Sequence, residues 1–147
     1  MVGKPIKLGL NSSFIDKIAT SFAPGVPVVD LVDTTGNPLN WRVRGTASWS
    51  RGPFDAALAL NYADAYVDTS GAIDGKVGSY TTVDANLRCE LGAMGARGKN
   101  LSLSLSLINA LDEQPPYVSA SGRSSHYDGA NASPLGRMVS FGLSKRW

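Results

Sequence analysis

Leucine and serine alternate without a break in the segment Leu101-Ser102-Leu103-Ser104-Leu105-Ser106-Leu107. A β-strand points successive side chains to opposite faces, so this period of two predicts one apolar face and one polar face. On an α-helix the same leucines would be scattered around the axis. We therefore predict a strand here. The number of segments with the same pattern then indicates the fold.

The same alternation recurs in five further segments of the chain. They are residues 4–19, 41–50, 53–67, 79–92 and 134–147. Lengths of roughly 10 to 15 residues exceed the five or six that are usual for strands of globular proteins. Such lengths suit a tilted membrane crossing. The sequence thus predicts an all-β fold with about six antiparallel transmembrane strands.

The connections between the predicted strands alternate in length. They are long at 20–40 and 110–133, medium at 68–78, and short at 51–52 and 93–98. Bacterial outer-membrane barrels have short periplasmic turns and longer extracellular loops. With a periplasmic C-terminus, every longer connection would lie outside the cell.

Aromatic residues are expected at the two boundaries of the apolar band. Trp41 and Trp49 share one face, and a tilt near 40° would separate them by roughly 20 Å in height. We expect Tyr62 and Tyr66 to join Trp41 at the outer aromatic girdle. Single aromatics in the core of a soluble sandwich are the alternative interpretation.

The composition does not distinguish a membrane barrel from a soluble sandwich, but it argues against several other classes of protein. The 147 residues are 43% hydrophobic and 18% charged, with a formal net charge of +2. No run of about 18 apolar residues is present, which excludes a transmembrane helix but not a barrel. The mild, scattered positive charge argues against nucleic acid as a partner. Cys89, the single cysteine, is expected to be an inert packing thiol.

No catalytic site, metal site or cofactor is predicted, so we do not expect an enzyme. His126 is the only histidine, which excludes a site with several histidine ligands. Asp112, Glu113 and Asp128 lack the regular spacing of a calcium loop, so we expect solvated loop carboxylates. An outer-membrane enzyme would need a convergent acid and base at the outer rim, which we do not find.

Several short motifs in the sequence resemble segments of one family of membrane proteins. They are NYADAY at 61–66, YTTVD at 80–84, NALDEQPPYV at 109–118, YDGANASPLGR at 127–137 and FGLSKRW at 141–147. In these segments the chain resembles the TonB-dependent receptors, which are plugged 22-stranded outer-membrane transporters. The resemblance covers essentially residues 1–147.

The resemblance implies a location, partners and a function. The chain would be the C-terminal part of a larger barrel of about 22 strands in the outer membrane of a Gram-negative bacterium. Its partners would be outer-membrane lipid, the plug domain, the outer-membrane assembly machinery, and TonB through a missing N-terminal region. The function would be uptake of a scarce nutrient such as a siderophore, cobalamin or a carbohydrate.

Two sets of residues follow as candidates for specific roles. The signal for barrel assembly would rest on Val139, Phe141, Leu143 and Trp147, which can also simply face lipid. The candidates for ligand contact in the lumen or loops are Arg42, Arg44, Arg88, Tyr117, Arg123, His126 and Tyr127. An arginine-rich lumen would suit an anionic ligand, although Asp84 and Glu90 lie on the same polar face. The alternative function is a soluble β-sandwich binding module, which extraction without detergent would support.

The expectation of a larger protein can be tested on the gene. Six strands cannot close a barrel, because the smallest outer-membrane barrels use about eight. We expect the reading frame upstream of Met1 to encode a plug of about 150 residues and about sixteen more alternating strands. A stop codon followed by a ribosome-binding site directly before Met1 would contradict this.

Overall fold

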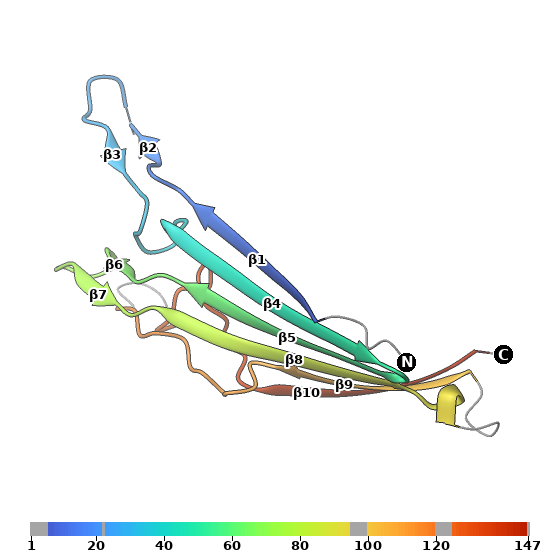
Figure 1. Ribbon diagram of the computed structural model, residues 1–147. Helices are drawn as coiled ribbons and strands as arrows, with labels where there is room; N and C mark the ends of the chain where they lie inside the picture. The colour runs from blue at the N-terminus through green and yellow to red at the C-terminus, as the bar shows by residue number, and fades with distance from the viewer. Residues whose placement is uncertain (1–5, 22, 95–99, 120–124, 147) are drawn as a thin grey trace.

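Six antiparallel strands form one open sheet in the order β1-β4-β5-β8-β9-β10 (Figure 1). The strands are β1 (Lys7–Phe14), β4 (Trp41–Arg51), β5 (Phe54–Ala63), β8 (Tyr80–Glu90), β9 (Leu101–Ile108) and β10 (Met138–Lys145). This computed structural model describes residues 6–21, 23–94, 100–119 and 125–146. The predicted all-β antiparallel fold is confirmed, while the sheet stays open, with β1 and β10 at its edges.

The strands have 8 to 11 residues, and those predicted at 4–19, 53–67, 79–92 and 134–147 are shorter than expected. The prediction of one strand over 53–67 is wrong, because β5 ends at Ala63 and the chain leaves the sheet there. The Asp64 carboxylate accepts hydrogen bonds from the amide of Ala65 and the hydroxyl of Tyr62, both at 2.8 Å. Such local bonds compete with the sheet ladder, which explains the break.

The register places most of the large apolar residues of the six strands on one face, with Ile108 and Met138 as exceptions on the other. Cross-strand partners in an antiparallel sheet project to the same side, and Leu58 pairs with Ala47 and Ala85, while Leu107 pairs with Ala85 and Val139. The apolar face carries Leu8, Leu10, Phe14, Trp41, Val43, Trp49, Leu58, Leu60, Tyr62, Val83, Leu87, Leu105, Val139, Phe141 and Leu143. The predicted alternation is confirmed.

The opposite face is polar along the same strands. It carries Arg42, Arg44, Asn61, Thr82, Asp84, Asn86, Arg88, Ser104, Ser106 and Ser140. Many of these side chains bond to one another across strands, as Asn86 does to Ser106 at 2.6 Å. The sheet therefore has two faces of opposite character from one edge to the other.

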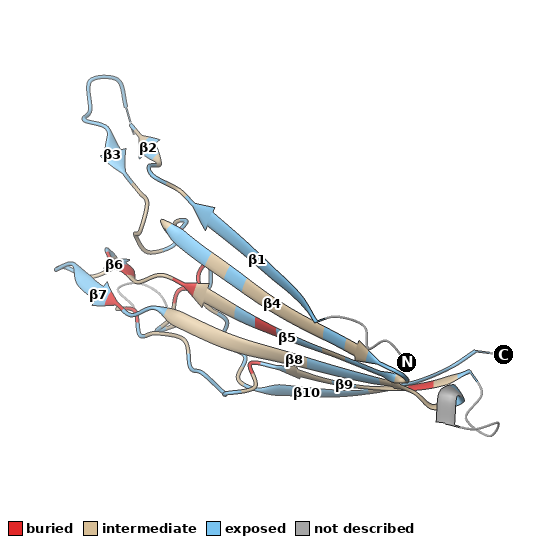
Figure 2. Ribbon diagram, in the orientation of Figure 1, coloured by how far each residue is buried: buried red, intermediate tan, exposed pale blue. Residues whose placement is uncertain are grey.

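Large side chains on the apolar face are exposed, with Phe141 at 70% and Leu58 at 55%. Figure 2 shows that buried residues gather mainly at one end of the sheet. A soluble sandwich would cover the apolar face with a second sheet. The part of the chain that the structure describes forms only two further sheets, each of two short strands. These are β2 (Ala19–Thr20) with β3 (Val29–Asp30), and β6 (Tyr66–Asp68) with β7 (Gly75–Val77).

All three long connections leave the same end of the sheet, called the loop end below (Figure 1). They span 15–40, 64–79 and 109–137, and the short connections lie at the opposite end. There, β4 and β5 are joined through Gly52 and Pro53, and the φ of 58° at Gly52 fits a tight hairpin turn. The predicted alternation of connection lengths is confirmed. The connection from β8 to β9 begins with the 3-10 helix η1 (Leu91–Met94).

Helices make a minor contribution to this fold. No helix in the described ranges is long and apolar enough to cross a membrane. The buried apolar cluster lies instead at the loop end. It consists of Leu39, Ala63, Tyr66, Val77 and Val118, with Tyr80 packed against it.

This cluster should be the site most sensitive to truncation. Leu39→Ala removes a side chain that is 2% exposed, and we expect it to lower the free energy of unfolding by about 2–5 kcal/mol. Leu111→Ala is the matched control, because Leu111 is 69% exposed, and its effect should stay within about 0.5 kcal/mol. Urea unfolding of both variants measures this, and equal effects would contradict a core at the loop end.

Candidate functional site

The long connections interlock at the loop end. The first and second connections pair through the amide of Val67, which donates to the carbonyl of Asp33 at 2.8 Å. The amide of Thr35 donates in turn to the carbonyl of Val67 at 3.2 Å. A parallel bridge between Thr34 and Val67 extends this pairing. The two connections are therefore held together by backbone as well as by side chains.

A buried carboxylate joins all three connections. Asp68, which is 4% exposed, accepts hydrogen bonds from the Thr35 hydroxyl at 3.1 Å, the Ser70 amide at 3.0 Å and the Ser119 amide at 2.5 Å. Burial by itself would raise the pKa of Asp68, but a hydrogen bond from the Ser70 hydroxyl, together with these bonds, outweighs it and lowers the pKa to about 2. Asp68 is thus ionised and structural.

A second buried carboxylate fastens the third connection to the first. Asp128 is 1% exposed, and it accepts from the amides of Gly36 at 2.9 Å and Ala130 at 3.0 Å, and from Asn131 Nδ2 at 2.8 Å. The Tyr66 hydroxyl also bonds to it. Burial would raise the pKa of Asp128, yet the donors together lower it. The expectation that Asp128 is a solvated loop carboxylate is wrong, because it meets donors from distant parts of the chain.

The start and the end of the third connection are tied to each other. Asn109 and Asp112 have φ angles of 50° and 58°, and the Asn109 side chain accepts from the amide of Glu113 at 2.9 Å. The Asp112 carboxylate accepts from the amide of Arg137 at 2.7 Å. Asp112 therefore acts as a brace for the loop. Among the described residues no three His, Cys, Asp or Glu side chains come together as a metal site.

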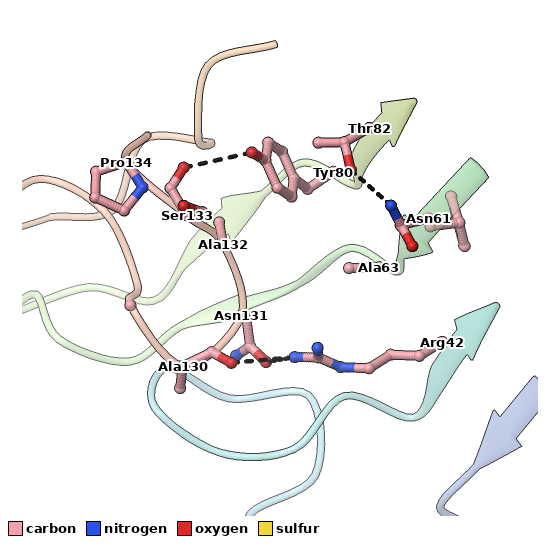
Figure 3. A pocket seen from close by; sticks show the side chains of 12 residues that line it. Arg42, Asn61, Ala63, Tyr80, Thr82, Ala130, Asn131, Ala132, Ser133 and Pro134 are labelled. Atoms are coloured by element: carbon pink, nitrogen blue, oxygen red, sulfur yellow. Dashed lines mark hydrogen bonds between the residues drawn. The ribbon is translucent and has the colours of Figure 1, made fainter. Parts of the chain in front are cut away.

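A cavity of about 400 Å³ lies between the polar face and residues 128–134, which we call the strap (Figure 3). Its lining consists of Arg42, Asn61, Tyr62, Ala63, Tyr80, Thr82, Gly129, Ala130, Asn131, Ala132, Ser133 and Pro134. Arg42 Nη2 donates to the carbonyl of Ala130 at 3.2 Å and to Asn131 Oδ1. The Tyr80 hydroxyl donates to the carbonyl of Ser133 at 3.3 Å. Two strands thus hold the strap over the polar face.

A polar network continues from this cavity across three strands. Asn61 Nδ2 donates to Thr82 Oγ1 at 3.2 Å and to Asp84 Oδ2 at 2.9 Å. Arg44 donates to Asn61 Oδ1 and lies 3.8 Å from the Asp84 carboxylate. A second cavity, of about 320 Å³, adjoins the first. Arg42 and Arg44 line it together with Asn11 and Ser13.

The predicted ligand-contact residues fall into separate places. Arg42 and Arg44 come together at the cavities, whereas Arg88 lies toward the opposite end of β8 and pairs with Glu90 at 2.6 Å. Arg88 therefore lies outside the lining of both cavities. Arg123 lies outside the described residues.

The remaining candidates lie in the third connection. The rings of Tyr117 and His126 stack with centroids 5.3 Å apart, and the Val118 amide donates to the His126 carbonyl at 3.0 Å. Tyr127 is half-buried and directly precedes Asp128. These aromatic residues are outside the lining of the cavity beneath the strap.

One of the four expected girdle residues is elsewhere. Trp41 and Tyr62 meet edge to face on the apolar face, with centroids 6.2 Å apart, and Trp49 lies near the other end of β4. Tyr66 as a girdle residue is wrong, because it is 6% exposed and packs in the loop-end cluster. The break at Asp64 removes it from the β5 ladder, so alternation no longer sets its direction.

The residues expected to carry the assembly signal lie on the sheet edge. Val139, Phe141 and Leu143 are exposed on the apolar face of β10. Trp147 lies outside the described residues.

Sequence reasoning missed the residues that build the loop end. They are Asp68, Tyr80, Asp128 and Asn131. The Asp-Gly pair at 128–129 was an available signal, since Asp commonly bonds to backbone amides two residues on. Nothing local indicated which distant amides it would also meet.

The chain matches no protein-family model, and no curated protein or solved structure is significantly similar to it. Function therefore has to be inferred from the geometry at the two faces and the loop end.

Acid should loosen the interlocked connections. A carboxylate whose folded pKa is lowered stabilises the fold above its ordinary pKa of 3.8, and that contribution is lost as the pH falls toward about 2. We expect amide protection at Gly36 and Ser119 to be constant above about pH 5 and to fall below about pH 4. Hydrogen exchange measures this against pH.

Asp68→Asn should flatten that pH dependence at Ser119, whereas Asp74→Asn, at an exposed position in the same connection, should leave it unchanged. An identical profile in both variants would contradict the role of Asp68.

Proposed function

We propose that this chain is the C-terminal wall of an outer-membrane β-barrel of the TonB-dependent receptor type. Its apolar face would contact lipid, its polar face would line the lumen, and its interlocked connections would lie at the outer mouth. One observation carries this proposal: all six strands expose large apolar side chains on the same face. Water-exposed surfaces rarely carry so extensive an apolar patch, because its hydration is unfavourable.

The dimensions of the sheet support a lipid environment. The longest strands, β4 and β8, have 11 residues each, and at a tilt near 40° such strands rise about 25 Å. That height matches the apolar band of outer-membrane barrels. Trp41 and Trp49 lie toward opposite ends of β4, as girdle residues would.

The connections support an orientation. Long connections at one end and a two-residue turn at the other are typical of extracellular loops and periplasmic turns. In this orientation the Gly52-Pro53 turn faces the periplasm and the strap faces the outside. A ligand from outside would meet the loop end first.

The open edges support a larger barrel. Unpaired backbone groups in lipid cost several kcal/mol each, so β1 and β10 would each need a further strand beside them. A barrel of about 22 strands with a plug, as the resemblance implies, would supply both. In that protein, a scarce nutrient of the siderophore, cobalamin or carbohydrate class would enter under the control of TonB and the plug.

Neighbouring residues on opposite faces test the proposal directly. Ala57 lies on the polar face and Leu58 on the apolar face, and both are exposed. In a Cys89→Ser background of the membrane-embedded protein, we expect Ala57→Cys to react with a water-soluble maleimide. Leu58→Cys should stay unlabelled until detergent is added, because lipid excludes the reagent.

The control is the same pair after solubilisation, where both cysteines should react. Equal labelling before detergent, or recovery of the protein in the soluble fraction, would contradict the membrane proposal and favour the soluble binding module.

A further inference from the structure

Arg42 lines the cavity, where the strap holds its side chain but leaves several of its N–H donors unused. Its two hydrogen bonds, to Ala130 and Asn131, both come from Nη2 (Figure 3). A guanidinium has five N–H groups, so those of Nη1 and Nε have no partner among the described residues. The strap thus positions the side chain without using up its capacity to bind.

The charge of Arg42 is not neutralised by a carboxylate in direct contact. Arg44 pairs with Asp84 and Arg88 with Glu90, whereas Arg42 forms no ion pair with a carboxylate of the described residues. The groups that accept from Arg42 are a carbonyl and a side-chain amide, which are neutral. Asp128 stands behind Asn131, but it is buried and already surrounded by donors. Arg42 therefore presents a positive charge to the cavity.

The remaining lining favours an anion as well. No Asp or Glu residue lines the cavity beneath the strap or the adjoining one, in the part of the chain that the structure describes. The Tyr80 hydroxyl already donates to Ser133, so in the first cavity Arg42 is the main donor left for a ligand. Asn11, Ser13 and Arg44 line the second cavity. Arg42 borders both, so a ligand could reach two arginines that lie on one face of β4.

We propose that these two cavities form a binding site for a small ligand that carries a carboxylate or phosphate group, with Arg42 as its principal contact. The volumes of about 400 and 320 Å³ suit a small molecule. Arginine N–H groups match the oxygens of carboxylate and phosphate. Arg44, Asn11 and Ser13, which line the adjoining cavity, receive the rest of the ligand. The inference rests on the proposed function only for the side from which the ligand arrives.

Titration of the detergent-solubilised protein tests this site. Isothermal calorimetry at constant ionic strength would use citrate, inorganic phosphate and, as the uncharged probe, glucose. We expect saturable binding of citrate or phosphate and none of glucose, and the preferred anion identifies the oxyanion class. Absence of saturable binding by both anions overturns the proposal.

Two substitutions that each remove one positive charge make the assignment specific. Arg42→Gln should raise the Kd about tenfold or more, because charge-assisted hydrogen bonds are lost. Arg88→Gln removes the same charge from the same face, but at a distance from the cavities, and should change the Kd by less than about twofold. Equal weakening in both variants would mean nonspecific attraction and would overturn the site.

Arg42→Gln could weaken binding simply by releasing the strap. Arg42→Lys is the control for this, because lysine keeps a positive charge and a donor for Ala130 and Asn131. Protection of the Gly36 amide, which bonds to Asp128, reports whether the strap stays in place. With the strap intact, we expect this variant to bind the anion more weakly than the native protein, since the planar fork is lost. Unchanged affinity overturns the role of Arg42.

The titration tests the anion site and the cysteine labelling tests the barrel, so either proposal can be overturned without the other. Correct labelling of Ala57→Cys and Leu58→Cys without anion binding would remove the anion site and leave the barrel. Anion binding by a protein whose two cysteines react equally in water would keep the site and remove the barrel.

Discussion

The structure depends on the coupling between a two-residue period and an unbroken antiparallel register. Each of the six strands pairs with the next without a slip, so most large apolar side chains of all six strands lie on one face. A shift of one residue in any strand would turn its whole apolar set to the polar side. The described residues leave that face exposed, and the proposal of a lipid environment rests on this observation.

No second layer of the described residues packs on the apolar face of the sheet. The buried contacts that stabilise the fold lie at the loop end instead. A small cluster around Tyr66 and Val77 packs there, and two ionised carboxylates, Asp68 and Asp128, gather amide and hydroxyl donors from all three long connections. Buried carboxylates are costly unless they are fully hydrogen-bonded. No buried side-chain nitrogen or oxygen of the described residues lacks a partner. The bonds to Asp68 and Asp128 link the three connections to one another.

Polar side chains on the polar face of the sheet also differ in how completely they are hydrogen-bonded. Beside Arg42, the side chains of Asn61, Thr82 and Asp84 bond to one another, which leaves them little capacity for a ligand. At the loop end, Arg42 is only partly satisfied, and the strap that holds it also roofs a cavity. The contrast between a closed network and an open guanidinium is what singles out one part of this face as a binding site. It also explains why Arg88, which has a carboxylate beside it, is a poor candidate.

The sequence by itself determined the class of fold, the two faces of the sheet and the end from which the long connections leave. These features depend on alternation and on turn residues such as Gly52, which act within a few residues. Only the tertiary structure decided that Tyr66 is buried, that Asp128 fastens two connections, and that Arg42 meets Asn131. Those contacts join residues up to 92 positions apart in the chain. Local periodicity carries no information about such pairs, because they form only where separate loops converge in space.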